Sequence, residues 1–328
     1  MISRVADHCF WFGRYVDRAE STARLLQVTR TLVFDADIPV TQCWQPLVIV
    51  SGELPAFIAR HGADAAGNGE VVQNYMTWDA ENMASLRSSV RAARESARVI
   101  RDVLSLEAWE EVNELYLWIG SDQAEKFYRE NREQFYRRVR RSTQLVLGLV
   151  RSTMLHDSPM SFLWLGAMLE RVGQTARILD MHHHTMNRES PHQIVEVALW
   201  LSLLGACSGH EAFVKKVKGR ISAQSVVSFL LFEPQFPRSL RYCLRSARGI
   251  LNGIWPEAHS DGIGRQSYER LDALARWLDE REATLAPAAI HEVLTHVVDE
   301  TGAICSHIAE DMLGPPRPTP AQSQSQTQ

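Results

Sequence analysis

The sequence predicts an all-α fold, a helical bundle-like domain built from two duplicated halves that are related by a pseudo-two-fold axis. Apolar residues recur at the three- and four-residue spacing of helices along most of the chain. Almost no stretch alternates apolar and polar residues as a strand would. One long segment is also repeated, because residues 11–26 match residues 164–179. Two large copies often pack about a shared axis, as the subunits of symmetric dimers do.

The repeat keeps small and charged residues in register. The matched pairs, all 153 residues apart, are Trp11 with Trp164, Gly13 with Gly166, Asp17 with Glu170, Arg18 with Arg171, and Arg24 with Arg177. A second segment, 85–94, returns as 239–248 at an offset of 154. We therefore predict one domain over residues 1–313, with an internal repeat of about 1–152 and 153–313. Residues 314–328 form a Pro/Gln/Ser-rich tail that cannot bury a core and should be disordered.

Composition narrows the class of protein. The chain has 328 residues, of which 45% are hydrophobic and 23% charged, as in an ordinary soluble globular protein. Its net charge of −4 makes nucleic-acid binding unlikely. The five cysteines are scattered without zinc-ligand spacing, which indicates a reducing cytosol and no metal site. The longest apolar stretch, 197–207, is too short to cross a membrane, so we expect a cytoplasmic protein.

The first half should begin with a long helix over 3–33, which Ser3 can cap and the stretch 35–39 ends. The next helix starts near Gln42. The Gly- and Ala-rich stretch 62–69 predicts a mobile loop, and Asn82 is a plausible cap for the helix after it. The remaining helices expected here are 71–78 (short helix or extended), 84–104, 106–121 and one long helix over 127–155.

The second half should repeat this scheme after a helix start at Asp157. The expected helices are 162–182, 194–207, 222–231, 238–252, 268–282 and 288–312, with loops over 183–191 and 253–265. Gly13 and Gly166 fall inside helices, where glycine costs about 1 kcal/mol relative to alanine. Close approach of another helix is the expected reason for both.

The repeated acid–arginine pairs carry the strongest functional signal. Adjacent residues on a helix point about 100° apart, so Asp17 and Arg18 do not simply bridge each other. In one interpretation, Asp17 and Glu170 each hold an arginine of the opposite copy. In the other, two carboxylates and two guanidiniums form a polar pocket on the pseudo-axis that binds a polar substrate. Buried charges need partners in either case.

Several other residues join this candidate site. The arginines of the second repeated segment share one helix face and should lie near the motif acids: Arg87, Arg91 and Arg94 in one copy, Arg241, Arg245 and Arg248 in the other. The catalytic candidates are Glu170 and Asp17. The substrate-binding candidates are Arg14, Arg18, Arg24, Arg87, Arg171, Arg177, Arg241, Trp11 and Trp164.

Other motifs are weaker. No Gly-rich loop is followed by Lys and Ser or Thr, so the chain has no P-loop and no ATP site of its own is predicted. The histidines at 182–184 with His192 suit a helix C-terminus better than a metal site. One helix face carries Glu292, His296 and Glu300, and we expect it to be exposed to solvent. The basic run 129–141 reads first as a solvated helix face and second as a docking surface.

The two motif segments resemble the bacterial alpha-E family, an all-helical domain with a Glu-Arg motif. The resemblance rests on Trp11-x-Gly-Arg-Tyr-x-Asp-Arg and on Leu165-Gly-x-x-Leu-Glu-Arg, and it extends over essentially 1–313. Two positions depart from the family pattern. Asp17 stands where Glu is usual, and Ala167 stands where Arg is usual, so the two copies of the site need not be symmetric.

The resemblance implies a role in an ATP-dependent system. Members are typically encoded beside, or fused to, a circularly permuted ATP-grasp protein, often with a transglutaminase-like protein. The implied function is the non-ATP-binding component of an amide-ligation system that makes or modifies small peptides, with ATP and Mg on the partner ligase. This chain would bind the amino-acid or peptide substrate. The alternatives are a helical scaffold without a small-molecule site, or an enzyme that uses Asp17 or Glu170 as a general base.

Overall fold

The computed structural model describes residues 3–35, 40–186, 193–254 and 264–312. Every regular element in these ranges is a helix, which confirms the all-α prediction. In chain order they are α1 (Ser3–Asp35), α2 (Val40–Val50), α3 (Leu54–His61), η1 (Ala63–Gly67), α4 (Gly69–Trp78), α5 (Leu86–Val99), α6 (Leu106–Ile119), α7 (Asp122–Glu130), α8 (Arg132–Thr153), α9 (Ser158–Met186), α10 (Gln193–Ala206), α11 (His210–Lys216), α12 (Ala223–Phe232), α13 (Leu240–Ile254), α14 (Arg265–Asp279), η3 (Pro287–Ala289) and α15 (Ile290–Met312). The predicted tail 314–328 and the side chains of the histidines at 182–184 and 192 lie outside the described residues.

The two motif helices, α1 and α9, form the centre of the molecule. They pack against each other more extensively than any other pair of helices. Gly13 and Gly166 mark their closest approach. A Cβ on Gly13 would lie 2.0 Å from the carbonyl oxygen of Leu163, and a Cβ on Gly166 would lie 2.0 Å from that of Phe10. Glycine is therefore required at both positions by backbone contact, as the sequence predicts.

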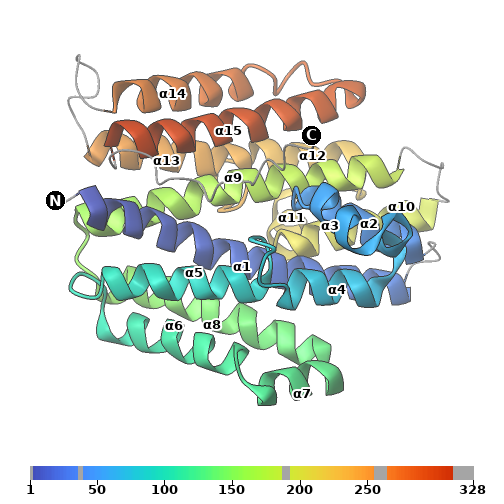
Figure 1. The fold of residues 1–328 in the computed structure, drawn as a ribbon. Coiled ribbons are helices and arrows are strands. Elements are labelled where there is room, and N and C mark those ends of the chain that lie inside the picture. Colours follow the sequence, from blue (N-terminus) through green and yellow to red (C-terminus); the bar gives the residue numbers. More distant parts are fainter. Residues whose placement is uncertain (1–2, 36–39, 187–192, 255–263, 313–328) are drawn as a thin grey trace, which may run out of the picture.

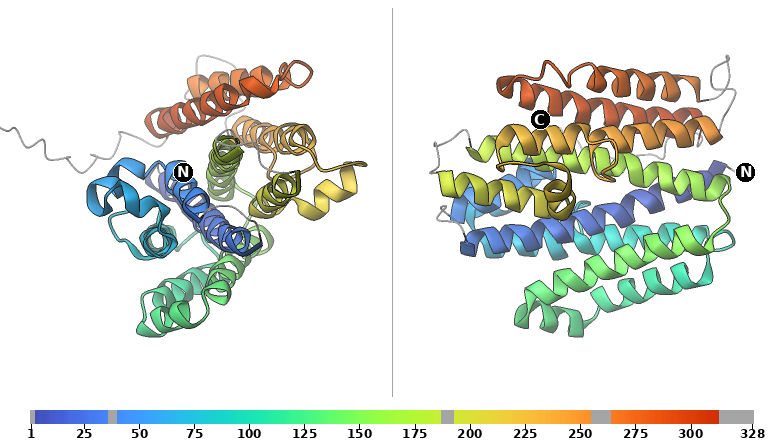
Figure 2. Two further views of the ribbon diagram at one scale, coloured as in Figure 1. Left: turned by 90° about the vertical axis from the view of Figure 1, so that its right-hand side faces the viewer. Right: turned by 180° about the vertical axis from the view of Figure 1, so that it is seen from behind.

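Further helices cover the two sides of this pair. The first helix, α1, packs against α5 and α8, with α6 outside them, whereas α9 packs against α13 and α15, with α14 outside them. Figure 1 shows these two groups on opposite sides of α1 and α9, and the end-on view in Figure 2 shows the same separation. Two shorter helices cross over: α2 packs on α9, and α10 packs on α1.

N-terminal caps explain helix boundaries that differ from those predicted from the spacing of apolar residues. Ser85 Oγ accepts a hydrogen bond from the Ser88 N–H at 3.1 Å and so begins α5, whereas the predicted cap, Asn82, is buried before the helix. Asn131 caps α8 through the Gln134 N–H at 3.1 Å. This cap divides the predicted helix 127–155 into α7 and α8, so the prediction of one helix there is wrong.

Two short elements were not predicted from the sequence. Leu54–His61 and His210–Lys216 are helices, and the stretch 62–69 contains η1, in which Ala66 is buried, rather than an open loop. Gly69 lies against Trp44, since a Cβ there would be 2.4 Å from Trp44 Nε1. The 3-10 helix η1 packs against α2, α3 and α4, and the turn just before α3 supplies Glu53 to the site described below.

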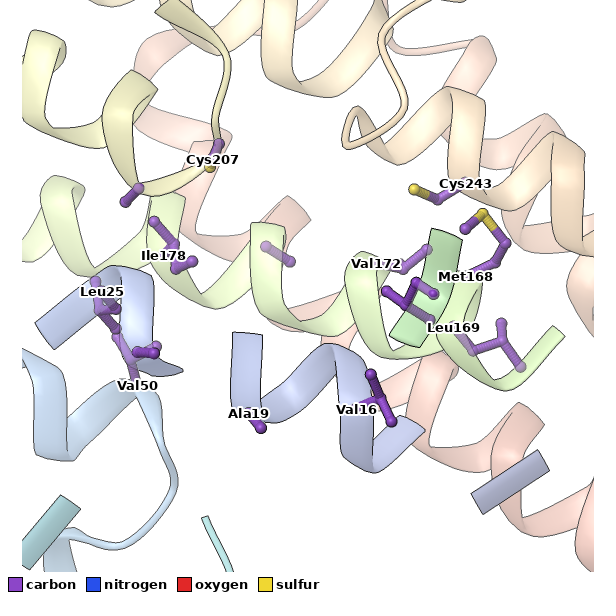
Figure 3. Packing of buried hydrophobic residues seen from close by; sticks show 14 of the residues in the cluster. Val16, Ala19, Leu25, Val50, Met168, Leu169, Val172, Ile178, Cys207 and Cys243 are labelled. Carbon is purple, nitrogen blue, oxygen red and sulfur yellow. The ribbon is translucent and has the colours of Figure 1, made fainter. Parts of the chain in front are cut away.

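The apolar core is continuous across both groups of helices. It includes Leu25 of α1, Val50 of α2 and Cys243 of α13, all of which Figure 3 shows. Within the described ranges, no single helix has the length and apolar character needed to cross a membrane. One pair, Glu196–Ala206 with His210–Lys216, meets those criteria only when taken together, and it is bent by 111° at its break.

Candidate functional site

The crossing of α1 and α9 brings the two acid–arginine pairs together across the helix interface. Arg18 donates to Glu170 through Nε at 2.7 Å and Nη2 at 2.9 Å, and Arg171 Nε donates to Asp17 at 2.6 Å. Each acid therefore holds the arginine of the opposite helix. Asp17 is paired with Arg171 rather than with its neighbour Arg18, and Glu170 with Arg18 rather than with its neighbour Arg171, in agreement with the helical geometry expected from the sequence.

Glu170 sits in the more open of two charge clusters. Besides Arg18, it accepts hydrogen bonds from Arg14 Nε at 2.9 Å and Gln174 Nε2 at 3.0 Å. The Glu170 side chain is only 2% exposed, whereas Arg14 and Arg18 are 17% and 18% exposed. Burial by itself would raise the pKa of Glu170. The charges of Arg18 and Arg14, together with hydrogen bonds from Arg18 and Gln174, outweigh burial and hold this pKa well below its usual range.

This cluster opens into a cavity of about 170 Å³, called here the polar cavity. It lies where α1 and α9 meet α2, the turn that follows α2, α4 and the residues just before α5. Its lining residues are Arg14, Arg18, Thr22, Leu25, Leu47, Val50, Ser51, Glu53, Met76, Met83, Ala84, Glu170, Gln174 and Arg177. The cavity is larger than the space of about 10–15 Å³ that one water needs, and smaller than the clefts of about 300–1,000 Å³ that hold drug-sized ligands.

Asp17 sits in the second cluster, which is closed. Its side chain is fully buried, and Arg171 and Arg238 are its cationic neighbours. Glu20, also fully buried, pairs with Arg24 and Arg238 and accepts a hydrogen bond from Gln144 Nε2 at 3.2 Å. None of these side chains lines the polar cavity.

The pKa values of the two acids of the closed cluster shift in opposite directions. Burial raises the pKa of Asp17, and the charges of Arg171 and Arg238 offset this only in part. Burial also acts to raise the pKa of Glu20, but Arg238 and Arg24 overcome it and lower that pKa to about 2. Glu20 is therefore a carboxylate over the whole physiological pH range.

The two clusters have different residues at one pair of matched sequence positions. Ala84 lines the polar cavity, and at the repeat offset of 154 its counterpart is Arg238. Arg238 places a guanidinium against Glu20 and Asp17, where the small Ala84 leaves space beside Glu170. The clusters differ in a second way, because Arg14 has Ala167 as its counterpart.

The structure divides the predicted binding residues between the two clusters. Arg14, Arg18 and Arg177 line the polar cavity, whereas Arg171 and Arg24 belong to the closed cluster. Each predicted tryptophan lies beside arginine rather than in the cavity. The guanidinium of Arg14 lies 4.6 Å from the Trp11 ring, and those of Arg171 and Arg151 lie 5.5 Å and 5.2 Å from the Trp164 ring.

The expectation that the second repeated segment supplies partners to the motif acids is wrong for the arginines of α13. Arg241 donates to Asp279 at 2.6 Å and to Glu282 at 2.7 Å, and Arg245 also pairs with Asp279. The physical reason is that α13 packs on α14, whose end carries these acids.

The arginines of α5 also find other partners. Arg94 binds Glu95 at 2.6 Å and Asn113 at 3.3 Å, and Arg91 donates to the carbonyl of Ala80. Arg87 is exposed and does not line the polar cavity. Neither Arg87 nor Arg241 is therefore placed with the acids by this structure.

Sequence reasoning missed Glu20, Arg238 and Gln144 of the closed cluster and Glu53 of the polar cavity. Glu20 lies one helical turn before Arg24 on the same face, which is a usable signal. Glu53 belongs to the turn before α3, and nothing in the sequence places that turn beside α1.

No group of three or more His, Cys, Asp or Glu side chains suited to a metal ion occurs among the described residues. The predicted solvent-exposed face of α15 is engaged elsewhere: His296 packs on Trp277 with ring centroids 4.1 Å apart, and Glu300 pairs with Arg270 at 3.3 Å. Arginines of the basic run also have acidic neighbours, for example Arg137 with Glu133 at 2.6 Å.

The fold and the paired sites define an all-helical domain with an acid–arginine pair on each of two central helices. Comparison with known families gives the same result. The model of the Alpha-E family, described as "a predicted alpha-helical domain with a conserved ER motif", matches residues 1–313, so the chain belongs to this family.

Relatives are found among mycobacterial proteins. The chain is 28% identical over 338 residues to "Uncharacterized protein Mb2597" of Mycobacterium bovis, and 27% identical to "Uncharacterized protein Rv2567" of Mycobacterium tuberculosis. The matches cover 90% of this chain but only 36% of the relatives, so the chain spans about a third of their length. No solved structure matches the chain.

Proposed function

We propose that this chain is the non-ATP-binding component of an ATP-grasp-linked amide-ligation system and that it binds an amino-acid or peptide substrate in the polar cavity. The observation that carries the proposal is the cavity beside Glu170, into which Arg14, Arg18 and Arg177 project from the two motif helices. The family resemblance supplies the expected partners. These are a circularly permuted ATP-grasp protein, which would hold ATP and Mg, and a transglutaminase-like protein, all in the cytoplasm.

Size and charge support a small, polar ligand. The cavity of about 170 Å³ suits a group of a few atoms better than a nucleotide. Its walls carry the three arginines together with Glu170 and Glu53, so one positive charge is in excess. Arginine forks recognise carboxylates with two parallel hydrogen bonds, which suits the acid end of an amino acid or peptide.

The alternative of general-base catalysis has less support. A base works best when its pKa lies near the operating pH. The pKa of Glu170 is held far below that range by Arg18 and Arg14, and Asp17 is fully buried away from the cavity. We therefore assign Glu170 to holding the arginines in position rather than to proton transfer.

The closed cluster is the observation that supports the scaffold alternative. Asp17, Glu20, Arg24, Arg171 and Arg238 pair with each other in the interior, which is how a purely structural network is arranged. Our proposal assigns this structural role to the closed cluster and the binding role to the polar cavity.

We also propose that the chain arose by duplication of a half-length ancestor. Equivalent helices have equivalent neighbours, since α5 and α8 pack on α1 as α13 and α15 pack on α9. The reciprocal contacts of Gly13 and Gly166 support the same relation. Divergence of Ala84 and Arg238 would then explain why the polar cavity is lined by Glu170 and not by Asp17.

A reconstituted reaction tests the proposed function. The purified chain is mixed with a circularly permuted ATP-grasp protein of the kind that the family resemblance implies, MgATP and single amino acids, and ADP formation is measured. We expect amino-acid-dependent ADP formation that requires this chain. Arg18→Gln should abolish it, whereas Arg276→Gln, on the exposed face of α14, should not. Full ADP formation in the absence of the chain would reject any role of the chain in the reaction. If ADP formation requires the chain but is unchanged by Arg18→Gln, the binding role is rejected and the scaffold alternative is favoured.

A further inference from the structure

Arg177 is the one arginine of the polar cavity with no hydrogen bond or ion pair to any residue that the structure describes. It projects from α9 one turn after Gly173, where a Cβ would lie 3.3 Å from Arg177 Nη1. The absence of a side chain at Gly173 thus leaves room for the guanidinium. Arg14 and Arg18, by contrast, are already engaged by Glu170.

The surroundings of Arg177 favour an anion beside it. Burial lowers the pKa of Arg177, and the charges of Arg18 and Arg14 act in the same direction against the attraction of Glu170. A partly buried cation without a partner is unfavourable, and a bound carboxylate would supply the missing charge and hydrogen bonds.

The polar cavity also carries an acid that can hold a cation. Glu53 lines it, and Glu53 Oε2 accepts a hydrogen bond from the Tyr75 hydroxyl at 3.1 Å. Ser51 and Thr22 add hydroxyl groups to the lining. A ligand that brings one carboxylate and one ammonium would match Arg177 and Glu53. A phosphate dianion would match less well, because Glu53 and Glu170 leave an excess of only one positive charge.

A second cavity adjoins the first at Arg177 and Val50, which line both. This aliphatic cavity has a volume of about 190 Å³ and lies between α2, α9 and α15. Its apolar lining residues are Pro46, Ile49, Val50, Leu294 and Val298. None of them is aromatic, so this part of the cavity suits a branched aliphatic group, whose burial is favoured by the hydrophobic effect. The polar lining residues are Arg177, Thr295 and Asp180, and Asp180 is paired with His291 at 2.7 Å.

We propose that the two cavities form one binding site for a free α-amino acid with a branched aliphatic side chain. The carboxylate binds Arg177, the ammonium faces Glu53, and the side chain enters the aliphatic cavity. This inference rests on the proposed function, whose substrate class it narrows. The C-terminal residue of a peptide has the same carboxylate and side chain but lacks the free ammonium. Binding measurements can therefore distinguish a free amino acid from a peptide C-terminus as the ligand.

Calorimetric titration of the purified chain, without any ligase, tests the inference. The probes are L-leucine, L-leucinamide (no carboxylate) and N-acetyl-L-leucine (no ammonium), each up to about 10 mM, which detects Kd values near 1 mM. We expect leucine to bind and both analogues to bind at least about tenfold more weakly. Failure of leucine to bind, or equal binding of leucinamide, would overturn the proposal. Equal binding of N-acetylleucine would assign the site to peptide C-termini instead and so reject the free amino acid.

Variants locate the binding. Loss of a charge-assisted hydrogen bond typically weakens binding roughly 10- to 100-fold, and we expect this of Arg177→Gln and of Glu53→Gln with leucine. Thr295→Trp, at an exposed position that lines the aliphatic cavity, should reduce the preference for leucine over alanine. Arg276→Gln, which lines neither cavity, is the matched control and should bind leucine as wild type does. Unchanged leucine binding by Arg177→Gln would overturn the proposal.

The two sets of experiments fail in different ways. If leucine binds through Arg177 but ADP formation does not require the chain, the ligation role is wrong and the binding site stands. If ADP formation requires the chain and Arg18 but leucine does not bind, the ligation role stands and the proposed substrate class is wrong.

Discussion

Gly13→Ala tests the close crossing of α1 and α9 on which both charge clusters depend. The new Cβ would lie 2.0 Å from the Leu163 carbonyl oxygen and 2.9 Å from its carbon, so the two helices would have to move apart. Overpacking typically costs about 1–3 kcal/mol, and a backbone obstacle places this site at the upper end of that range. Alanine is about 1 kcal/mol better than glycine in a helix. We therefore expect a net loss of about 2 kcal/mol in the free energy of unfolding.

Urea-induced unfolding measures this difference, and Gly148→Ala is the matched control. Gly148 lies in α8, and a Cβ there would meet nothing within 4 Å. Gly148→Ala should therefore stabilise the chain by up to about 1 kcal/mol. Gly166→Ala should behave like Gly13→Ala, because its Cβ would meet the Phe10 carbonyl at 2.0 Å. If Gly13→Ala and Gly148→Ala shifted stability in the same direction, the close crossing would be refuted.

Three further predictions concern stability. The lowered pKa values of Glu20 and Glu170 contribute stability that is fully present above about pH 4.5 and is lost as the pH falls toward 2. In pH-dependent urea unfolding, Glu20→Gln should reduce this acid-side loss, and an unchanged slope would contradict the assignment. Ser85→Ala should lower the unfolding free energy by about 1 kcal/mol through loss of the cap on Ser88, and an unaltered urea midpoint would show that the cap is not needed. Arg238→Ala should cost about 3–5 kcal/mol, because it breaks buried pairs, and a melting temperature equal to that of wild type would contradict this.

The helical architecture was predictable because helix periodicity is a local property of the sequence. The spacing of apolar residues in 3–33 and 162–182 corresponds closely to α1 and α9, and Gly13 and Gly166 correctly indicated close helix packing. The errors lie where a single polar side chain determines the position of a helix boundary. Asn131 interrupts an otherwise continuous apolar pattern, and Ser85 takes the capping role expected of Asn82.

The sequence predicted the acid–arginine pairs of the site but not the partners of the other candidate arginines. The repeat identified both acid–arginine pairs, since they lie on the two central helices. It could not show that Arg241 is held by Asp279 at the end of α14 and by Glu282 in the turn after it, because those contacts join distant parts of the chain. The difference between Ala84 and Arg238 is visible in the sequence, but its meaning depends on which side of α1 and α9 each residue lies.

The central claim is that one copy of the motif is a closed structural cluster and the other is an open binding site. The most direct measurement is urea unfolding of the matched variants Arg171→Gln and Arg18→Gln. Arg171→Gln leaves the fully buried Asp17 without its hydrogen-bonded arginine and should cost about 3–5 kcal/mol. Arg18→Gln leaves Glu170 paired with Arg14 beside the polar cavity and should cost less than half as much. Equal losses, or a larger loss for Arg18→Gln, would contradict the division of the motif into a closed and an open copy.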